Sequence, residues 1–418
     1  MGDETFTRRE IIRSTATAAV WGVVSRMTPA VQANTPEESE DGDVPCGWSQ
    51  FGATEANTGA LTDLSGPVAP GPRRWKLPAD ERAHAIVIDR SSVYATDGSE
   101  LYARRRSDGA LEWRVVHDHN LLSAPAISDG HIYVGCRATD RSGTIRAYDT
   151  SSGTTEWTVT PPTPVTGISP PTVSDGIVYA VGYGFGAGTD DRLYALDERT
   201  GTIHWSRSTG PSSIARETTA GVAVGDGNVI IAGNALQSVD PRTGEPHWTQ
   251  RAPTSFKTIG TTAPSVANGR VFCTRQTDAG PMVECRDLAD GTLQWHVRIA
   301  SESNRPLAGG RIPMAVDGTA VYVGYTNDRN QHATISALAI RDGAECWHAS
   351  FDRETHQILG LAVTSETLYT HREAINTSDG TIRWQAPADL ETGPPAIARE
   401  MVCFGGESVV AFDTQATT

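Results

Sequence analysis

The side chains that could do chemistry in this sequence gather in segments that recur at regular intervals along the chain. In order, these segments contain Arg82 and His84; His117, Asp118 and His119; Arg216 and Glu217; Lys257; Arg305 and Arg311; His356; and Glu391. Cationic groups brought to one face would attract an anionic ligand or an acidic segment of a partner. The alternative is that each residue is solvated in its loop or pairs with a neighbouring carboxylate.

A metal site is the second chemistry to consider, because His117, Asp118 and His119 are residue types that bind zinc. On a strand, His117 and His119 would share one face, and further ligands would have to come from elsewhere, such as His84 or His356. We therefore predict exposed polar loop residues here and no metal site. The motifs of common nucleophilic enzymes are missing from the sequence, so a hydrolase or lyase would rest on the histidines alone.

The strongest pattern is a repeat that must position these segments. Gly-x-x-x-Trp occurs seven times, at Gly109/Trp113, Gly153/Trp157, Gly201/Trp205, Gly244/Trp248, Gly291/Trp295, Gly343/Trp347 and Gly380/Trp384, and Trp75 precedes the first copy. Trp75 and Trp384 are 309 residues apart, which gives a mean interval of about 44 residues, as in four-stranded propeller blades. We expect each tryptophan to wedge between neighbouring blades.

Within one repeat, short runs of alternating apolar residues are separated by Asp-Gly and Thr-Gly turns, as in residues 170–205, which predicts antiparallel strands. After Trp384, residues 394–413 provide three more strands, and Arg73–Leu77 provides the missing outer strand. The sequence therefore predicts an all-β, eight-bladed propeller that an N-terminal strand closes. Blade seven is expected to be short.

The N-terminal region predicts export. Arg8 and Arg9 precede a mildly apolar stretch, which is typical of a twin-arginine signal peptide over residues 1–33. Residues 34–46 form an acidic linker, and the propeller covers residues 47–418. Cys46 lies in a context that does not match a lipobox, so lipid attachment stays open.

Composition excludes some functions. The chain has 50 Asp and Glu against 35 Lys and Arg, a net charge of −15, which argues against a nucleic-acid partner. No apolar run is long enough to span a bilayer after the signal is removed. Only Lys76 and Lys257 are lysines, a composition typical of halophiles or of a GC-rich genome.

The run Ala195-Leu196-Asp197, Gly201 and Trp205 resembles the tryptophan-docking motif of the pyrroloquinoline-quinone (PQQ) repeat propellers. Residues 47–59 (GWSQFGATEANTG) resemble the N-terminal lead-in of secreted members, here of a halophilic archaeal type. The resemblance covers residues 47–413 and implies the propeller fold. It leaves the activity open, because this superfamily contains both quinoprotein dehydrogenases and non-catalytic scaffolds.

Quinoproteins of this superfamily carry PQQ against a disulfide of adjacent cysteines, with a calcium site and a catalytic Asp. The six cysteines here, Cys46, Cys136, Cys273, Cys285, Cys346 and Cys403, include no adjacent pair, and no calcium loop is recognisable. Cys273 and Cys285 flank one hairpin and are expected either to cross-link or to be small buried residues. We therefore predict no cofactor.

Together these features predict an exported, monomeric, non-catalytic scaffold that binds an extracellular or cell-surface protein or ligand. The alternative is a divergent PQQ-dependent oxidoreductase with calcium in an atypical channel site.

Overall fold

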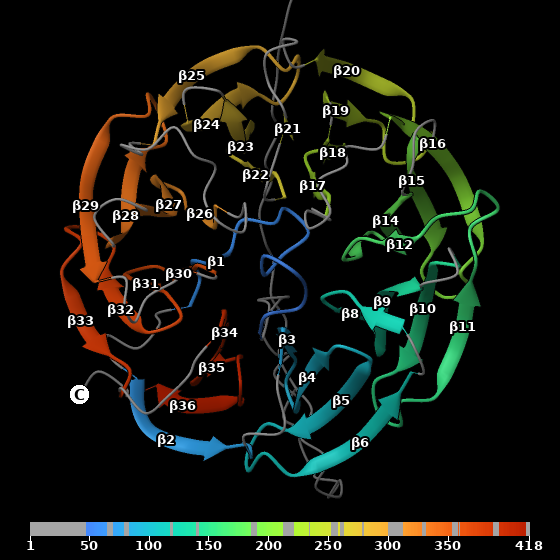
Figure 1. The fold of residues 1–418 in the computed structure, drawn as a ribbon, viewed down its shortest axis with the longest axis horizontal. Coiled ribbons are helices and arrows are strands. Elements are labelled where there is room, and N and C mark those ends of the chain that lie inside the picture. Colours follow the sequence, from blue (N-terminus) through green and yellow to red (C-terminus); the bar gives the residue numbers. More distant parts are fainter. Residues whose placement is uncertain are drawn as a thin grey trace, which may run out of the picture. The chain divides into compact units, whose positions relative to one another are not determined.

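Eight β-sheets, antiparallel except where β1 joins β30, follow one another around a central axis (Figure 1). The computed structural model describes residues 47–64, 70–78, 83–117, 120–138, 142–184, 190–211, 221–233, 235–251, 258–259, 263–277, 280–299, 312–327, 332–352, 358, 360–387 and 393–414, all in one compact unit. None of these residues is helical, so none forms a helix that could cross a membrane. The all-β, eight-bladed prediction is confirmed.

The strands run from the axis outward in each blade, in these ranges. Blade 1 is β3 (Ala85–Ile88), β4 (Ser92–Asp97), β5 (Glu100–Arg105) and β6 (Leu111–Val116). Blade 2 is β7 (Asn120–Leu122) and β8 (Ala126–Ser128), β9 (His131–Ala138), β10 (Thr144–Asp149) and β11 (Thr155–Val159). Blade 3 is β12 (Gly167–Ile168) and β13 (Thr172–Ser174), β14 (Ile177–Tyr183), β15 (Asp190–Asp197) and β16 (Ile203–Pro211). Blade 4 is β17 (Ala223–Gly225), β18 (Asn228–Ala232), β19 (Ala235–Val239) and β20 (Pro246–Arg251).

The second half of the ring repeats the arrangement. Blade 5 is β21 (Thr258–Ile259) and β22 (Ser265–Ala267), β23 (Arg270–Thr277), β24 (Gly280–Asp287) and β25 (Leu293–Arg298). Blade 6 is β26 (Met314–Val316), β27 (Ala320–Asn327), β28 (His332–Ala339) and β29 (Glu345–Asp352). Blade 7 is β30 (Ala362–Thr364), β31 (Thr367–Tyr369), β32 (Glu373–Asn376) and β33 (Ile382–Gln385), with β1 (Ala60–Leu61) added inside it. Blade 8 is β34 (Pro395–Ala398), β35 (Met401–Phe404), β36 (Val410–Thr414) and β2 (Pro70–Lys76).

The ring closes through blade 8, whose strands come from both ends of the propeller sequence. β2 pairs antiparallel with β36, with Trp75 opposite Ala411 and Lys76 opposite Val410. The predicted closing strand began at Arg73, whereas β2 begins at Pro70. Pairing with β36 covers an edge that would otherwise expose unpaired backbone groups.

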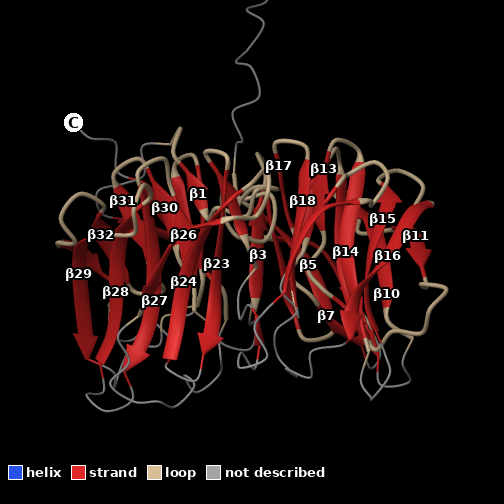
Figure 2. Cartoon of the chain, turned by 90° about the horizontal axis from the view of Figure 1, so that it is seen from above, coloured by secondary structure: helices blue, strands red, loops and turns tan. Residues whose placement is uncertain are grey.

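Antiparallel pairing divides the connections between two ends of the ring. Turns from the first to the second strand and from the third to the fourth strand lie at one end, here called the turn end (Figure 2). In blade 2 the first of these turns has φ of 41° at Asp129 and 80° at Gly130, as a two-residue type I′ hairpin requires. The remaining connections begin and end at strand ends on the opposite side of the ring.

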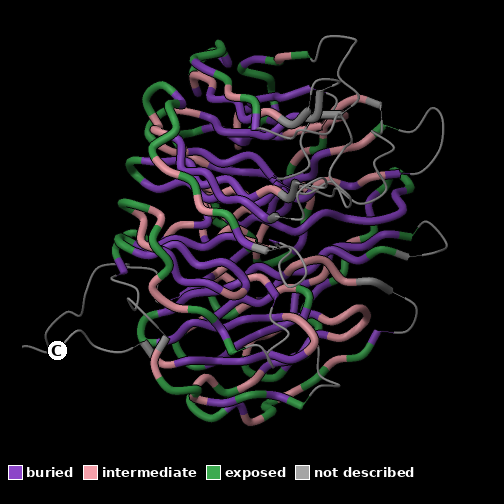
Figure 3. Tube along the Cα trace, turned by 60° about the vertical axis from the view of Figure 1, so that its left-hand side comes forward, coloured by how far each residue is buried: buried purple, intermediate pink, exposed green. Residues whose placement is uncertain are grey.

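The core lies between neighbouring blades, because successive strand residues face alternate sides of each sheet. Buried residues follow the strands, and exposed residues gather at turns and outer strands (Figure 3). Tyrosines such as Tyr94, Tyr133 and Tyr322 are among the largest fully buried side chains, and each lies about 6 Å, ring to ring, from the tryptophan of its own blade.

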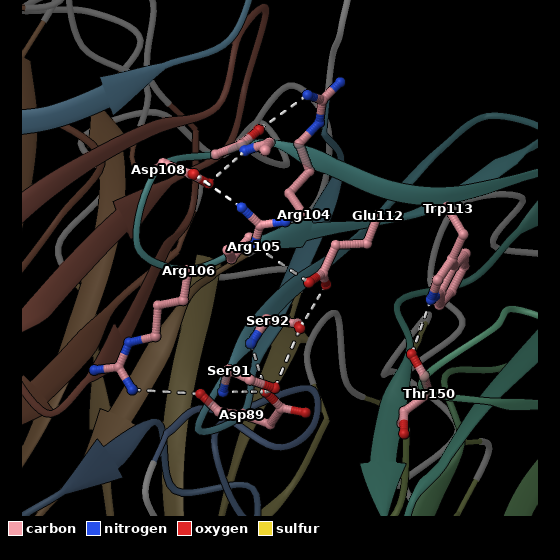
Figure 4. Close-up of polar contacts among 12 residues, drawn as sticks. Asp89, Ser91, Ser92, Arg104, Arg105, Arg106, Asp108, Glu112, Trp113 and Thr150 are labelled. Carbon is pink, nitrogen blue, oxygen red and sulfur yellow. Dashed lines mark hydrogen bonds and ion pairs between the residues drawn. The ribbon is translucent and has the colours of Figure 1, made fainter.

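Each tryptophan from Trp75 to Trp347 lies on the turn glycine of the next repeat rather than of its own. Trp113 of β6, for example, donates its indole N–H to the Thr150 carbonyl over 2.8 Å (Figure 4). A Cβ added to Gly153 would lie 2.6 Å from the Trp113 ring. The other pairs are Trp75 on Gly109, Trp157 on Gly201, Trp205 on Gly244, Trp248 on Gly291, Trp295 on Gly343 and Trp347 on Gly380.

Candidate functional site

His117 is buried, which makes the prediction of an exposed loop residue wrong at this position. It follows β6, and its ring reaches blade 2, where Arg146 Nη1 lies 2.8 Å from His117 Nδ1 and Tyr148 Oη lies 2.9 Å from Nε2. Because a guanidinium can only donate, Nδ1 must accept, and a neutral ring then donates from Nε2 to Tyr148. Burial raises the pKa of Tyr148 to about 12. His117 therefore joins two blades.

His84 lies at the far end from the turns and is exposed. Its Nδ1 is 3.2 Å from Asp97 Oδ1, and 71% of its side chain is accessible. This is the local pairing with a carboxylate that the sequence offered as the alternative to a cationic funnel. The two described candidates, His84 and His117, thus have different local partners.

The other candidates lie outside the described residues. They are Arg82, His119, Arg216, Lys257, Arg305, Arg311 and His356, together with Asp118, Glu217 and Glu391. The anionic-ligand funnel accordingly stays a prediction. Within the described ranges, no three His, Cys, Asp or Glu side chains lie close enough to hold a metal ion.

The described cysteines are free, so the cross-link that the hairpin positions of Cys273 and Cys285 left open is not formed. In blade 5, Phe272 lies opposite Cys285 and Cys273 lies opposite Glu284, so Cys273 and Cys285 face opposite sides of the hairpin. Both are buried and free, and burial raises the pKa of Cys273 to about 12 and of Cys285 to about 11. They are small buried residues, one of the two predicted alternatives. The described cysteines therefore do not supply the disulfide expected beside PQQ.

Blade 5 contains a buried group of charges that the sequence did not single out. Arg275 pairs with Glu284, and Arg286 Nη2 lies 2.9 Å from the other oxygen of the same carboxylate. Cys273, on this face of the sheet, belongs to a cluster with Ile230 of blade 4. Burying these charges requires that they pair closely, so the triad is a structural contact that joins β23 to β24 within blade 5.

Residues Gly47–Leu64, here called the strap, cross the centre of the ring at its turn end (Figure 1). The strap runs past the inner strands in chain order, from blade 1 to blade 7, and accepts one backbone N–H from six of them. These bonds join Ile88 to Trp48 (2.8 Å), Ile127 to Ser49 (2.7 Å), Val224 to Glu55 (2.7 Å), Val266 to Ala56 (2.9 Å), Val316 to Thr58 (2.7 Å) and Val363 to Gly59 (2.8 Å).

Two amide side chains of the strap also form hydrogen bonds with the blades. At blade 3, the Gln50 Oε1 accepts from Val173 N–H over 2.8 Å, and its Nε2 donates to the carbonyl of the same residue over 3.3 Å. At blade 5, Asn57 Nδ2 donates to the Pro264 carbonyl over 2.8 Å. Both amides are buried. Sequence reasoning missed this role, although every inner strand that donates to the strap has Ile or Val at the donor position.

Comparison with known proteins agrees with this architecture. A family model described as outer membrane protein assembly factor BamB matches residues 67–184, 135–216, 189–357 and 331–418. The protein of that name from Salmonella typhimurium is 26% identical over 317 residues, which is 72% of this chain and 73% of that protein.

Solved structures give the same fold at low identity. Quinohemoprotein alcohol dehydrogenase from Comamonas testosteroni superposes with a TM-score of 0.71 at 14% identity, covering 89% of this chain and 81% of that one. BamB from Moraxella catarrhalis superposes with a TM-score of 0.58 at 15% identity, covering 81% of this chain and 98% of that one. A likeness at this level of identity shows the fold alone.

Proposed function

Since the chain belongs to the family described as outer membrane protein assembly factor BamB, we propose that it is an exported scaffold that binds another protein without catalysis. The observation that carries the proposal is the pairing of two groups of charged and polar side chains inside the ring. Arg146 with His117 joins two blades, and Arg275 and Arg286 with Glu284 join two strands of blade 5, so both groups have structural partners. A rigid ring with long connections at one end suits recognition of a protein surface.

Affinity capture tests the binding role. The mature chain, from about Asn34 onward, is immobilised and exposed to the secreted and cell-surface fractions in high salt. We expect saturable retention of the same protein in repeated preparations, and its loss when the immobilised chain is unfolded first. Retention of nothing above the unfolded control would contradict the proposal.

The alternative oxidoreductase is tested by titrating PQQ into the protein with calcium while tryptophan fluorescence and dye reduction are recorded. We expect neither saturable binding nor dye reduction, because the sequence has no adjacent cysteines and the described cysteines are free. Saturable binding with dye reduction would replace the scaffold proposal.

Export by the twin-arginine route is tested in the signal sequence. Arg8→Lys together with Arg9→Lys should leave the protein inside the cell, because this route reads the arginine pair. Arg13→Lys, which leaves the pair intact, is the matched control and should be exported normally. Export of the double variant at the normal level would remove this part of the proposal.

A high-salt habitat is the last part of the proposal. With a net charge of −15, self-repulsion should weaken as salt screens the surface carboxylates. We expect the melting temperature to rise steadily with added KCl, and a flat response would contradict a halophilic origin.

A further inference from the structure

The strap has the structure of a bound peptide rather than of a blade strand. Only Ala60–Leu61 pairs as a strand, parallel to β30. The residues before it make single backbone bonds to one blade after another, and φ is positive at Gly52, Ala53, Asn57 and Gly59. A segment of this shape adds no sheet of its own and lies across the ends of sheets that other residues form.

The backbone donors that hold the strap belong to the blades, and buried strap residues such as Trp48 and Leu61 pack into the same core cluster. These donors are backbone N–H groups near the ends of β3, β8, β13, β17, β22, β26 and β30. Those strands are fixed within their sheets by pairing with their second strands, and the sheets are joined by the tryptophan contacts. Strand pairing within the blades therefore holds the donors in position, which lowers the entropic cost of binding a peptide to them.

We propose that the turn end of the channel is a peptide-binding site and that Gly47–Leu64 is its intramolecular ligand. The site takes a peptide read mainly through its carbonyl groups, as in strand addition. Specificity comes from two buried amides, at Gln50 and Asn57, and from the buried side chains of Trp48, Leu61 and Leu64. The side chains of Phe51 and Glu55 are exposed and contribute little to recognition.

The proposal requires the strap to remain bound without its covalent link to the ring. A protease recognition sequence placed between Leu64 and Pro70 of the full-length chain allows the folded protein to be cut there. Because β2 begins at Pro70, the cut breaks the covalent link between the ring and the N-terminal fragment that contains the strap, and it leaves the ring closure intact. We expect the strap fragment to co-elute with the ring in native buffer. Separation of the two in native buffer would overturn the proposal.

Specificity is tested in the same cut protein through the dissociation rate of a labelled strap fragment. Gln50→Ala should raise this rate at least about tenfold, because it leaves the buried backbone groups of Val173 without their partners. The matched control, Glu55→Ala, keeps the carbonyl bond and should change the rate by less than about twofold. Equal rates for the two variants would show that retention does not depend on the amide and would overturn the proposed recognition.

Discussion

Seven of the eight blade junctions use one tryptophan contact, and the junction between blades 7 and 8 uses another. At the seven, an indole ring lies on a turn glycine of the next blade. At the eighth, Trp384 stacks on Phe404, with ring centroids 6.2 Å apart, and meets Phe412 edge-on at 5.5 Å. The Trp384 indole N–H finds no acceptor within the described part of the chain.

The difference follows from how the ring closes. In blades 1–7 a turn joins the third strand to the fourth and supplies both the glycine and the carbonyl that accepts the indole N–H. In blade 8 these strands are β36 and β2, from opposite ends of the propeller, so no turn joins them. Aromatic side chains take the place of the glycine. The tryptophan contact is therefore a property of the turn as much as of the tryptophan.

The largest effect should come from removing a ring at a glycine junction. Trp157, which is 9% exposed and donates to the Glu198 carbonyl over 3.1 Å, is the test residue. We expect Trp157→Ala to lower the free energy of unfolding by about 4 kcal/mol, since it leaves a large cavity. Trp384→Ala, at a partly buried ring, should cost less, and denaturant titration of both variants compares them. An equal or larger loss at Trp384 would show that the aromatic junction is not the weaker one.

A smaller effect should come from the glycine itself. Gly153 has φ of 68°, and an added Cβ would meet the Trp113 ring, whereas Gly130 in the same blade has φ of 80° and open space around it. Both Ala variants suffer the backbone strain of about 1–2 kcal/mol, and only Gly153→Ala must also displace the ring. We expect Gly153→Ala to be the less stable variant by about 2 kcal/mol in denaturant titration. Equal losses would show that the ring adapts without cost.

The repeat predicted the ring well because it is visible in the residue types at fixed positions. Gly153 and Trp157 mark a turn and a contact that recur at a fixed period, and Trp75 near the start implied a closing strand. The strap was not predictable in this way, because a carbonyl such as that of Trp48 or Glu55 accepts a bond whatever side chain it carries. His117 looked like a loop residue because its partner Arg146 lies 29 residues away, on the next blade.

The two kinds of junction should also differ in how far alkaline pH lowers the free energy of unfolding. Burial, and then the nearby Asp317 carboxylate, raises the pKa of Tyr322 at a glycine junction, while Phe404 at the aromatic junction cannot ionise. Above about pH 10 the unfolded tyrosine loses its proton and the folded one keeps it, so stability falls as pH rises. We expect Tyr322→Phe to reduce this slope by about 1.4 kcal/mol per pH unit. Phe404→Leu, as the control, should leave the slope unchanged, and an identical slope in all three proteins would contradict the assignment.

The smallest effect should come from removing the indole hydrogen bond alone. Trp113 and Trp384 are both partly buried, but only Trp113 donates to a turn carbonyl, that of Thr150. Replacing each by Phe keeps an aromatic ring, so the losses of packing should be similar. Trp113→Phe should cost about 1 kcal/mol more, because it leaves the Thr150 carbonyl without its donor. If denaturant titration finds the same loss in both variants, the glycine junctions are held by ring contact alone, and the turn contributes its glycine but not its carbonyl.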